Sequence, residues 1–406
     1  MPLPSLFRFK PMAAVSVTHS KTLFPGRGGA TLCATKKGLV SYGGSNRSGE
    51  LFSDSQLFTS PGAPIESLFD TDTRADAEGR RLPGLAGHAS TCLKLGDSEY
   101  ILHFGGINFV DEVASGGLYE SLENCSWREI VCENSPSGRT GHSLCTVPTP
   151  FVVESSTGES DRYPIRPLRE VLGGNPWEAN CILFGGSSPS DGCLNDLYIL
   201  TCTDGAITPE SGRHYKWTSP NTTGPCPPAR ELHAAFIRPA IVQLFPPNFP
   251  GVVETMVRVV SPPLLCIHGG RSEDGAPRSD LCVLNLETNI WLPPVKTNYS
   301  LCSSAAAPTP DGLKLLQFGG LMGGAAGLSG ALVVLDTAGA EADPESWKWT
   351  TPKLQTIPTP RFASAASCLP NKKFPLFTNF TFCVWGGMTV SDDLCEALWI
   401  SSGSCE

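Results

Sequence analysis

A short apolar segment that ends on two adjacent glycines occurs six times along this chain of 406 residues. Glycine has no side chain to pack and weakens a strand interior. The recurrence of two glycines after each apolar run therefore indicates a backbone conformation that other residues rarely adopt. A sharp turn at positive φ out of a crowded position is such a conformation. The six pairs, spaced 62, 80, 84, 50 and 67 residues apart, are Gly43–Gly44, Gly105–Gly106, Gly185–Gly186, Gly269–Gly270, Gly319–Gly320 and Gly386–Gly387. This spacing predicts six copies of one supersecondary unit.

The segments around each glycine pair predict four short strands per unit. A polar turn and another apolar strand follow each pair, as in the sequence NDLYIL at positions 195–200. A tryptophan often closes the unit, at Trp127, Trp217, Trp291, Trp347 and Trp349. In the first unit, which lacks this tryptophan, we expect Phe69 to replace it. Ahead of the glycine strand, another strand opens with arginine at Arg27, Arg139, Arg230 and Arg361.

Two units depart from the arginine pattern. In the second unit Leu85 takes the arginine position, and in the fifth the segment 298–304 contains neither arginine nor histidine. The fold class does not depend on these positions, because short apolar runs bounded by Gly, Pro, Asn, Asp and Ser recur throughout the chain. No window has the sustained i, i+3, i+4, i+7 apolar pattern of an amphipathic helix. The sequence therefore predicts an all-β protein.

Four strands, a double glycine and a late aromatic residue in each unit resemble the kelch repeat, and the resemblance covers essentially the whole chain. It implies a six-bladed β-propeller, formed as a single domain by residues 1–406, with four-stranded blades around a central channel. The sixth unit ends one strand short, after the segment EALWI at 396–400. We expect the N-terminal segment Leu6–Met12, with Phe7 and Phe9, to supply the missing outer strand and close the ring.

Extra length is concentrated in two insertions, at about 147–180 and 238–263. Both fall between the first and second strands of adjacent units, so they should emerge side by side on one face of the propeller. The second is apolar and could extend its hairpin as two longer strands. Loops of this length are usually functional or disordered. Two interpretations stay open, namely an embellishment that packs on its own blade and a surface that binds a partner.

The resemblance implies a different binding surface on the opposite face. Related kelch adaptors bind acidic or polar peptide segments there, through arginines at the start of the innermost strands. By position, the candidate residues are Arg27, Arg139, Arg230 and Arg361, together with Ser45, Asn46, Arg47, Asn108, Ser187 and Arg271 from the loops after the glycines. Guanidinium groups suit carboxylate or phosphate recognition. The alternative is that these arginines brace neighbouring blades through backbone carbonyls.

Charge and cysteine usage limit the remaining function classes. The net charge is −9, and because residues 1–49 carry seven basic and no acidic residues, the rest of the chain is more acidic still. An acidic body argues against nucleic-acid binding, and no apolar stretch is long enough for a membrane span. Cysteines such as Cys33, Cys181 and Cys266 fall at interior strand positions, which predicts reduced thiols and a cytoplasmic protein. The acid-free N-terminus leaves an organellar transit peptide as the alternative.

Motifs for catalysis were not found. The chain has no Cys-x-x-Cys, no Gly-x-Ser-x-Gly and no phosphate-binding loop, so we expect no cofactor and no metal. His88, His142 and His233 share one repeat position, which favours a structural role. The sequence thus predicts a monomeric scaffold that binds a partner protein, through an acidic or phosphorylated segment at the channel mouth or through the insertions. An enzyme or small-molecule binder that uses the channel mouth is the alternative.

Overall fold

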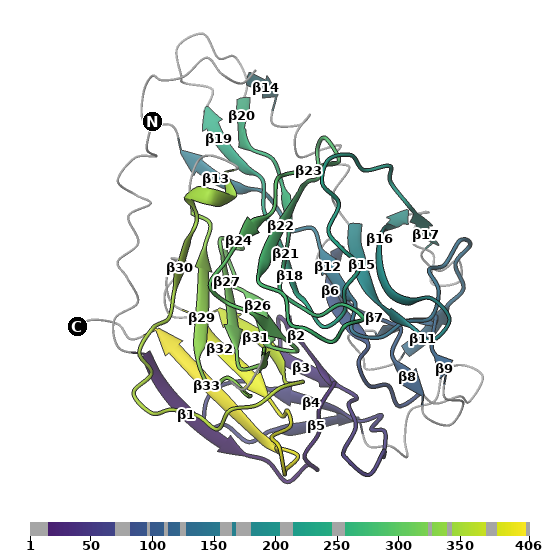
Figure 1. The fold of residues 1–406 in the computed structure, drawn as a ribbon, viewed down its shortest axis with the longest axis vertical. Helices are drawn as coiled ribbons and strands as arrows, with labels where there is room; N and C mark the ends of the chain where they lie inside the picture. Colours follow the sequence, from purple (N-terminus) through teal and green to yellow (C-terminus); the bar gives the residue numbers. More distant parts are fainter. Residues whose placement is uncertain are drawn as a thin grey trace.

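A computed structural model describes residues 15–69, 82–95, 98–108, 113–121, 127–154, 165–167, 180–203, 214–245, 256–323, 327–338, 343–370 and 380–402. The chain is an all-β, six-bladed propeller, as predicted (Figure 1). Each blade is an antiparallel sheet in which the innermost strand opens the unit and the following strands step outwards. The glycine pairs follow the second strand of each blade, or in blade 3 lie near its end, and we call the face on which they lie the Gly-Gly face.

The strands of the six blades follow the predicted units. Blade 1 contains β2 (Thr31–Thr35), β3 (Gly38–Tyr42), β4 (Ser55–Phe58) and β5 (Glu66–Phe69), and blade 2 contains β6 (Ala89–Leu95), β7 (Ser98–Phe104), β10 (Leu118–Ser121) and β11 (Trp127–Ile130). Blade 3 contains β12 (Ser143–Thr146), β15 (Asn180–Ser188), β16 (Gly192–Thr203) and β17 (His214–Thr218). Blade 4 contains β18 (Ala234–Arg238), β21 (Leu264–His268), β22 (Asp280–Asn285), β23 (Ile290–Trp291) and β24 (Val295–Lys296). Blade 5 contains β26 (Ala305–Pro308), β27 (Lys314–Phe318), β29 (Leu332–Asp336) and β30 (Lys348–Thr350), and blade 6 contains β31 (Ala365–Pro370), β32 (Phe380–Trp385) and β33 (Glu396–Ser402).

An N-terminal strand completes blade 6, as expected, but its position differs from the prediction. Strand β1 (Val15–Lys21) pairs antiparallel with β33, from Val15 opposite Ser402 to Lys21 opposite Glu396. Figure 1 shows β1 in purple beside β33 in yellow, so the two ends of the described chain meet in one sheet. Val15 is fully buried in the cluster between blades 5 and 6, and Val17 packs against the same cluster. Alternating valines therefore set this register, whereas the predicted segment Leu6–Met12 lies outside the described residues.

The glycine pairs join neighbouring blades through their backbone. At Gly186, where φ is +96°, an added Cβ would lie 2.7 Å from the Thr140 carbonyl oxygen, so only glycine fits. The N–H of the second glycine donates to the carbonyl at the arginine position of the next blade, at 2.8–2.9 Å in all six cases. These bonds run from Gly44 to Leu85, Gly106 to Arg139, Gly186 to Arg230, Gly270 to Leu301, Gly320 to Arg361 and Gly387 to Arg27. They form a closed belt, and because only main-chain groups take part, Leu85 and Leu301 serve as well as arginine.

A second backbone ring surrounds the channel. The residue two positions after the arginine position has positive φ in every blade, and its N–H donates to the carbonyl of the matching residue in the preceding blade, at 2.7–3.0 Å. The six members are Gly29, Gly87, Gly141, Leu232, Ser303 and Ala363. Three are not glycine, and a positive φ costs such residues energy that the closed ring must offset.

Apolar clusters fill the boundaries between blades. Aromatic residues that precede the glycines pack against outer-strand aromatics of the next blade, as in Phe104–Trp217 and Phe184–Trp291, with ring centroids 5.3 and 5.7 Å apart. At the boundary of blades 6 and 1, Trp385 meets Phe58 at 5.2 Å, and the side chain of Phe69 is outside the described set. Among the described residues, the boundary between blades 1 and 2 has the smallest cluster, which comprises Tyr42, Leu82, Leu85, Tyr119 and Trp127.

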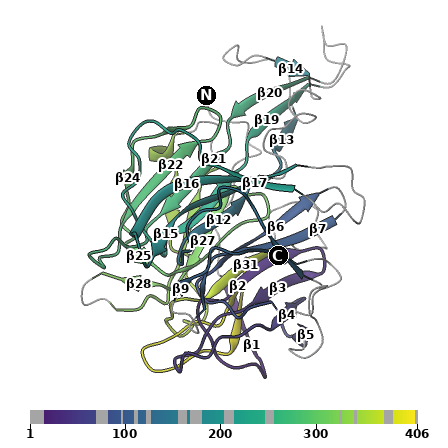
Figure 2. The ribbon, with the colours of Figure 1, turned by 90° about the vertical axis from the view of Figure 1, so that its right-hand side faces the viewer.

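The two insertions meet in one additional sheet. Strand β13 (Phe151–Glu154) from blade 3 pairs in parallel with β19 (Ile241–Phe245) from blade 4. Strand β19 pairs antiparallel with β20 (Met256–Ser261), which pairs with β14 (Ile165–Pro167). Figures 1 and 2 show this sheet beyond one end of the blades, on what we call the insert face. The expectation that the insertions emerge side by side is therefore confirmed.

The base of this sheet is anchored in the propeller. Ile241 and Val242 are fully buried, and the buried Arg238 guanidinium donates to Ser261 Oγ at 2.5 Å and to the Thr337 carbonyl of blade 5 at 3.2 Å. The root of the sheet is thus tied to blades 4 and 5.

The fourteen cysteines within the described ranges are thiols rather than disulfides. Cys33, Cys145 and Cys181 are on interior strands, and burial raises the pKa of the Cys145 and Cys181 thiols to about 12. In the part of the chain that the structure covers, no helix has the length and apolar character needed to cross a membrane.

Candidate functional site

The four predicted arginines are buried, and their guanidinium groups bind groups of this chain. Arg139 donates to both carboxylate oxygens of Asp196 at 2.6 and 2.9 Å, to the Gly185 carbonyl at 3.1 Å, and to the carbonyl and hydroxyl of Ser137 at 3.0 Å each. All five guanidinium N–H groups are accounted for. The clasp ties the segment before the innermost strand to the glycine pair and to Asp196 of the third strand in the same blade.

The same clasp recurs in three other blades. Arg27 pairs with Asp54 at 2.5 Å and Arg230 pairs with Asp280 at 2.7 Å. Arg361 pairs with a glutamate instead, through Oε1 of Glu396. Each arginine also donates to the carbonyl of the first glycine in its own blade, namely Gly43, Gly269 or Gly386.

The two blades without the arginine also lack the carboxylate. The carboxylate comes just before the residue that pairs with the last residue ahead of the glycines, and in blade 3 this position is Asp196. The strand registers place Gly117 at this position in blade 2 and Ala331 in blade 5. Leu85 is thus matched with Gly117, and Leu301 with Ala331. A buried charge without its partner is strongly destabilising, so loss of both charges together follows from the physics of the clasp.

These contacts support the bracing interpretation of the arginines, in a modified form. The guanidinium braces its own blade, and the backbone carbonyl of the same residue receives the bond from the neighbouring blade. Because the side chains of Arg27, Arg139, Arg230 and Arg361 are buried with carboxylates of this chain, we do not assign them to a partner.

Other predicted residues lie on the same face, in the loops after the glycines. Arg47, with 41 % of its side chain exposed, pairs with Asp393 at 3.3 Å, and Arg271, with 38 % exposed, pairs with Glu231 at 2.8 Å. Asn46 donates to Glu50 within its own loop. Ser45 and Ser187 form isolated backbone bridges to Gly28 and Thr140. Asn108 ends the short strand β8 (Ile107–Asn108), which pairs with β9 (Val113–Ala114).

A hollow of about 420 Å³ lies beside Arg271, between the loops of blades 4 and 5. Its lining comprises Arg271, Asp274, Gly275, Ala276, Pro277, Cys302, Leu321, Met322 and Gly323. The short strands β25 (Leu301–Cys302) and β28 (Leu321–Met322) pair with each other beside it. Its chemistry is mixed, since one arginine and one aspartate flank small and apolar residues.

The histidines that share a repeat position lie between blades, where His88 and His142 are buried. His88 contacts Thr31 Oγ1 at 3.0 Å and His233 contacts Ser143 Oγ at 3.0 Å, each across a blade boundary. Burial lowers the pKa of His88 and of His233 to about 3, so both imidazoles are neutral. Their contacts fit the structural role expected for them. Among the described residues, no group of three or more His, Cys, Asp or Glu side chains is arranged to hold a metal ion.

No family model and no curated protein matches this sequence.

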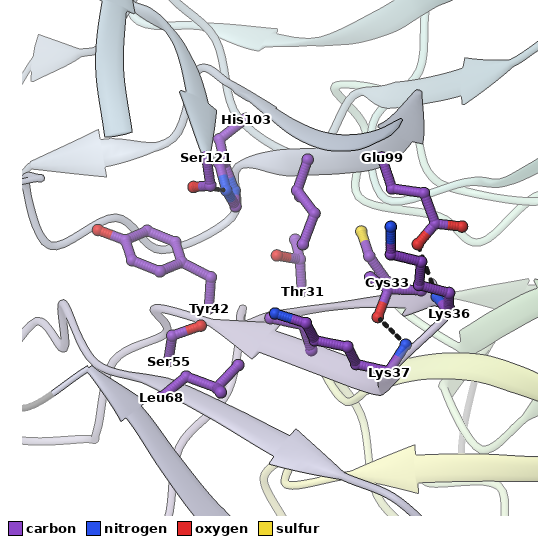
Figure 3. A pocket seen from close by; sticks show the side chains of 13 residues that line it. Thr31, Cys33, Lys36, Lys37, Tyr42, Ser55, Leu68, Glu99, His103 and Ser121 are labelled. Carbon is purple, nitrogen blue, oxygen red and sulfur yellow. Dashed lines mark hydrogen bonds between the residues drawn. The ribbon is translucent and has the colours of Figure 1, made fainter. Parts of the chain in front are cut away.

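One cavity lies away from the predicted surfaces, between blades 1 and 2 (Figure 3). Its volume is about 60 Å³. Blade 1 contributes Thr31, Cys33, Val40, Tyr42, Ser55 and Leu68, and blade 2 contributes Glu99, Ile101, His103 and Ser121. The exposed turn between β2 and β3, with Lys36 and Lys37, lies at its outer end. Sequence reasoning missed this site, although Ser55, Ser121 and His103 stand where blade 3 carries Leu197, Leu200 and Leu183.

Proposed function

We propose that this protein is a kelch-type propeller that acts as an interaction scaffold and presents the sheet formed by β13, β19, β20 and β14 to a partner protein. One observation carries the proposal, namely the pairing of strands from two separate insertions into a sheet that the six blades do not need. Each blade already has its four strands, and ring closure is complete with β1.

The geometry of the sheet suits a binding surface. Its root is held by Arg238 and by the buried residues Ile241 and Val242, so a partner would meet a preorganised surface rather than a loose loop. Its outer strands, β13 and β14, each pair on one side within the sheet. An edge strand with unpaired backbone groups can accept a strand from another chain.

The Gly-Gly face is the second candidate surface, on the strength of the hollow beside Arg271. Arg47, Arg271 and Asn108 remain candidates there. Both arginines already pair with carboxylates of this chain, so an acidic partner segment would have to displace or share them. For this reason we place the insert face first.

Proximity labelling followed by mass spectrometry, with three forms of the protein, tests the proposal. In the first variant, short Gly-Ser linkers replace residues 149–178 and 243–257 together, which leaves the buried root in place. In the second, Arg47 and Arg271 are both changed to glutamate. We expect proteins enriched by the natural chain to be lost with the first variant and kept with the second, both being folded by circular dichroism. The reverse result would move the interface to the Gly-Gly face, and enrichment kept by both variants would refute both surfaces.

A further inference from the structure

The boundary between blades 1 and 2 is built differently from its neighbour. Ser55 pairs with Tyr42 just before a glycine pair, and in the next blade Leu118 pairs with Phe104 at the same point. Three further positions of this boundary differ from the next boundary in the same way, by strand register and repeat position. The leucines Leu118, Leu144, Leu183 and Leu200 at the boundary of blades 2 and 3 correspond to Ser55, Ser90, His103 and Ser121 at the boundary of blades 1 and 2.

Four large apolar side chains are therefore replaced by three small hydroxyl side chains and one imidazole. The replaced leucines all belong to the cluster that packs blade 2 against blade 3. Loss of that volume accounts for the cavity, which by its size has room for roughly four to six water-sized positions. A cavity in a packed interior is destabilising, and a position that violates local packing rules is often functional.

The polar groups of this boundary form a continuous hydrogen-bonded chain. Thr31 Oγ1 contacts Ser90 Oγ at 2.8 Å, Ser90 Oγ contacts His103 Nδ1 at 2.7 Å, and His103 Nε2 contacts Ser121 Oγ at 3.1 Å. Burial, together with the nearby His88, holds the pKa of His103 well below its usual range. The imidazole is therefore neutral, and the chain carries no charge.

Three members of this chain, Thr31, His103 and Ser121, line the cavity. Figure 3 shows His103 and Ser121 together on one side of it, with Tyr42 and Thr31 beside them. A hydroxyl can donate one hydrogen bond and accept others, and its hydrogen rotates to suit the partner. The remaining walls include the apolar side chains of Val40, Leu68 and Ile101.

We propose that this cavity binds a small uncharged molecule with a mostly apolar body and one hydroxyl or carbonyl group. The polar group would bond to the Thr31 or Ser121 hydroxyl, and the body would lie against Val40, Leu68 and Ile101. A neutral polar chain offers no counter-charge at the inner end, which disfavours a charged head there. The turn at Lys36–Lys37 is exposed and marks the way in from solvent. This site is separate from the insert sheet, so it does not depend on the function proposed above.

Titration calorimetry and thermal unfolding with phenol, cyclohexanol, cyclohexanone and 1-pentanol as test ligands examine this inference. We expect at least one of them to bind saturably with one-to-one stoichiometry and to raise the Tm by about 1–2 °C at saturation. The same ligand should shift the imidazole ¹H–¹⁵N signals of His103 in a histidine-labelled sample. If none of the four ligands binds saturably, the inference is wrong.

The variants Ser121→Leu and Ser55→Leu place in this boundary the side chain that the next boundary carries. Either one should fill the cavity and abolish ligand binding, while the unliganded protein keeps or raises its Tm. Two positions are used so that one variant remains if the other does not fold. Ser391→Leu, on an exposed loop of blade 6, is the matched control and should bind the ligand like the natural protein. Binding that persists in a folded Ser121→Leu or Ser55→Leu protein would overturn the assignment.

Discussion

The arginine clasps make a sharp energetic prediction, because the chain itself contains blades with and without them. In blade 3 the pair is Arg139 and Asp196, whereas blade 5 has Leu301 and Ala331 at the same positions. We therefore compare three variants, Arg139→Leu, Asp196→Ala, and the double change that copies blade 5. Each single change leaves one charged group at a site built for a pair.

The expected magnitudes follow from burial. Arg139 is fully buried, so Asp196→Ala strands an uncompensated guanidinium and should cost about 3–5 kcal/mol of unfolding free energy. Arg139→Leu strands a carboxylate whose side chain is 33 % exposed, and it also frees the carbonyls of Gly185 and Ser137, each worth about 1 kcal/mol. The double variant loses these carbonyl bonds but leaves no unpaired charge. It should cost about 2 kcal/mol, no more than Arg139→Leu alone, which corresponds to a coupling energy of about 3–5 kcal/mol.

Urea unfolding at neutral pH, followed by tryptophan fluorescence, measures the cycle. The pair Arg47 and Asp393 is the control, since 41 % of the arginine side chain is exposed and a coupling below about 1 kcal/mol is expected. If the costs of the two single changes in blade 3 simply add, with a coupling below about 0.5 kcal/mol, the clasp is not the unit described here. Partner binding lost in a fully stable Arg139→Leu protein would return the arginine to the binding surface.

Three further predictions concern acid, the N-terminus and the thiols. Burial lowers the pKa of His88 and His233 to about 3 and of His268 to about 4, so below pH 6.5 the unfolded chain binds more protons than the folded one. The free energy of unfolding should therefore fall as the pH falls from 6.5 toward 3, by about 2 kcal/mol per histidine at pH 5. A Tm that does not change between pH 7 and 5 would contradict this. Deletion of residues 1–12 should leave the Tm nearly unchanged. Deletion of residues 1–21 removes β1 and exposes the edge of β33, so it should lower the Tm markedly. Equal effects of the two deletions would refute ring closure by β1. A thiol assay under denaturing, non-reducing conditions should find close to sixteen free groups, and two or more disulfides would contradict the reduced state expected from the buried thiols.

The repeat allowed most of the fold to be predicted, because a double glycine has few structural uses and six copies in register have one common explanation. The closing strand shows the limit of this reasoning. The aromatic segment Leu6–Met12 matched the repeat better by composition, but the register of β33 is satisfied by the alternating valines of β1. The register between strands from the two ends of a chain depends on which side chains are buried against the neighbouring blade. That burial is decided by the tertiary structure and is not visible in the sequence alone.

The candidate sites show the same division. Local sequence determined the arginine positions, the two insertions and the interior placement of the cysteines, because each depends on spacing within one unit. Whether Arg139 faces solvent or Asp196 was decided only in the folded blade, where residues 57 positions apart form a bidentate pair. The pairing of β13 with β19, and the cavity bounded by Ser55 and Ser121, lie between blades and required their packing. Spacing along the chain determines what one blade contains, but the surfaces on which function depends are made where two blades meet.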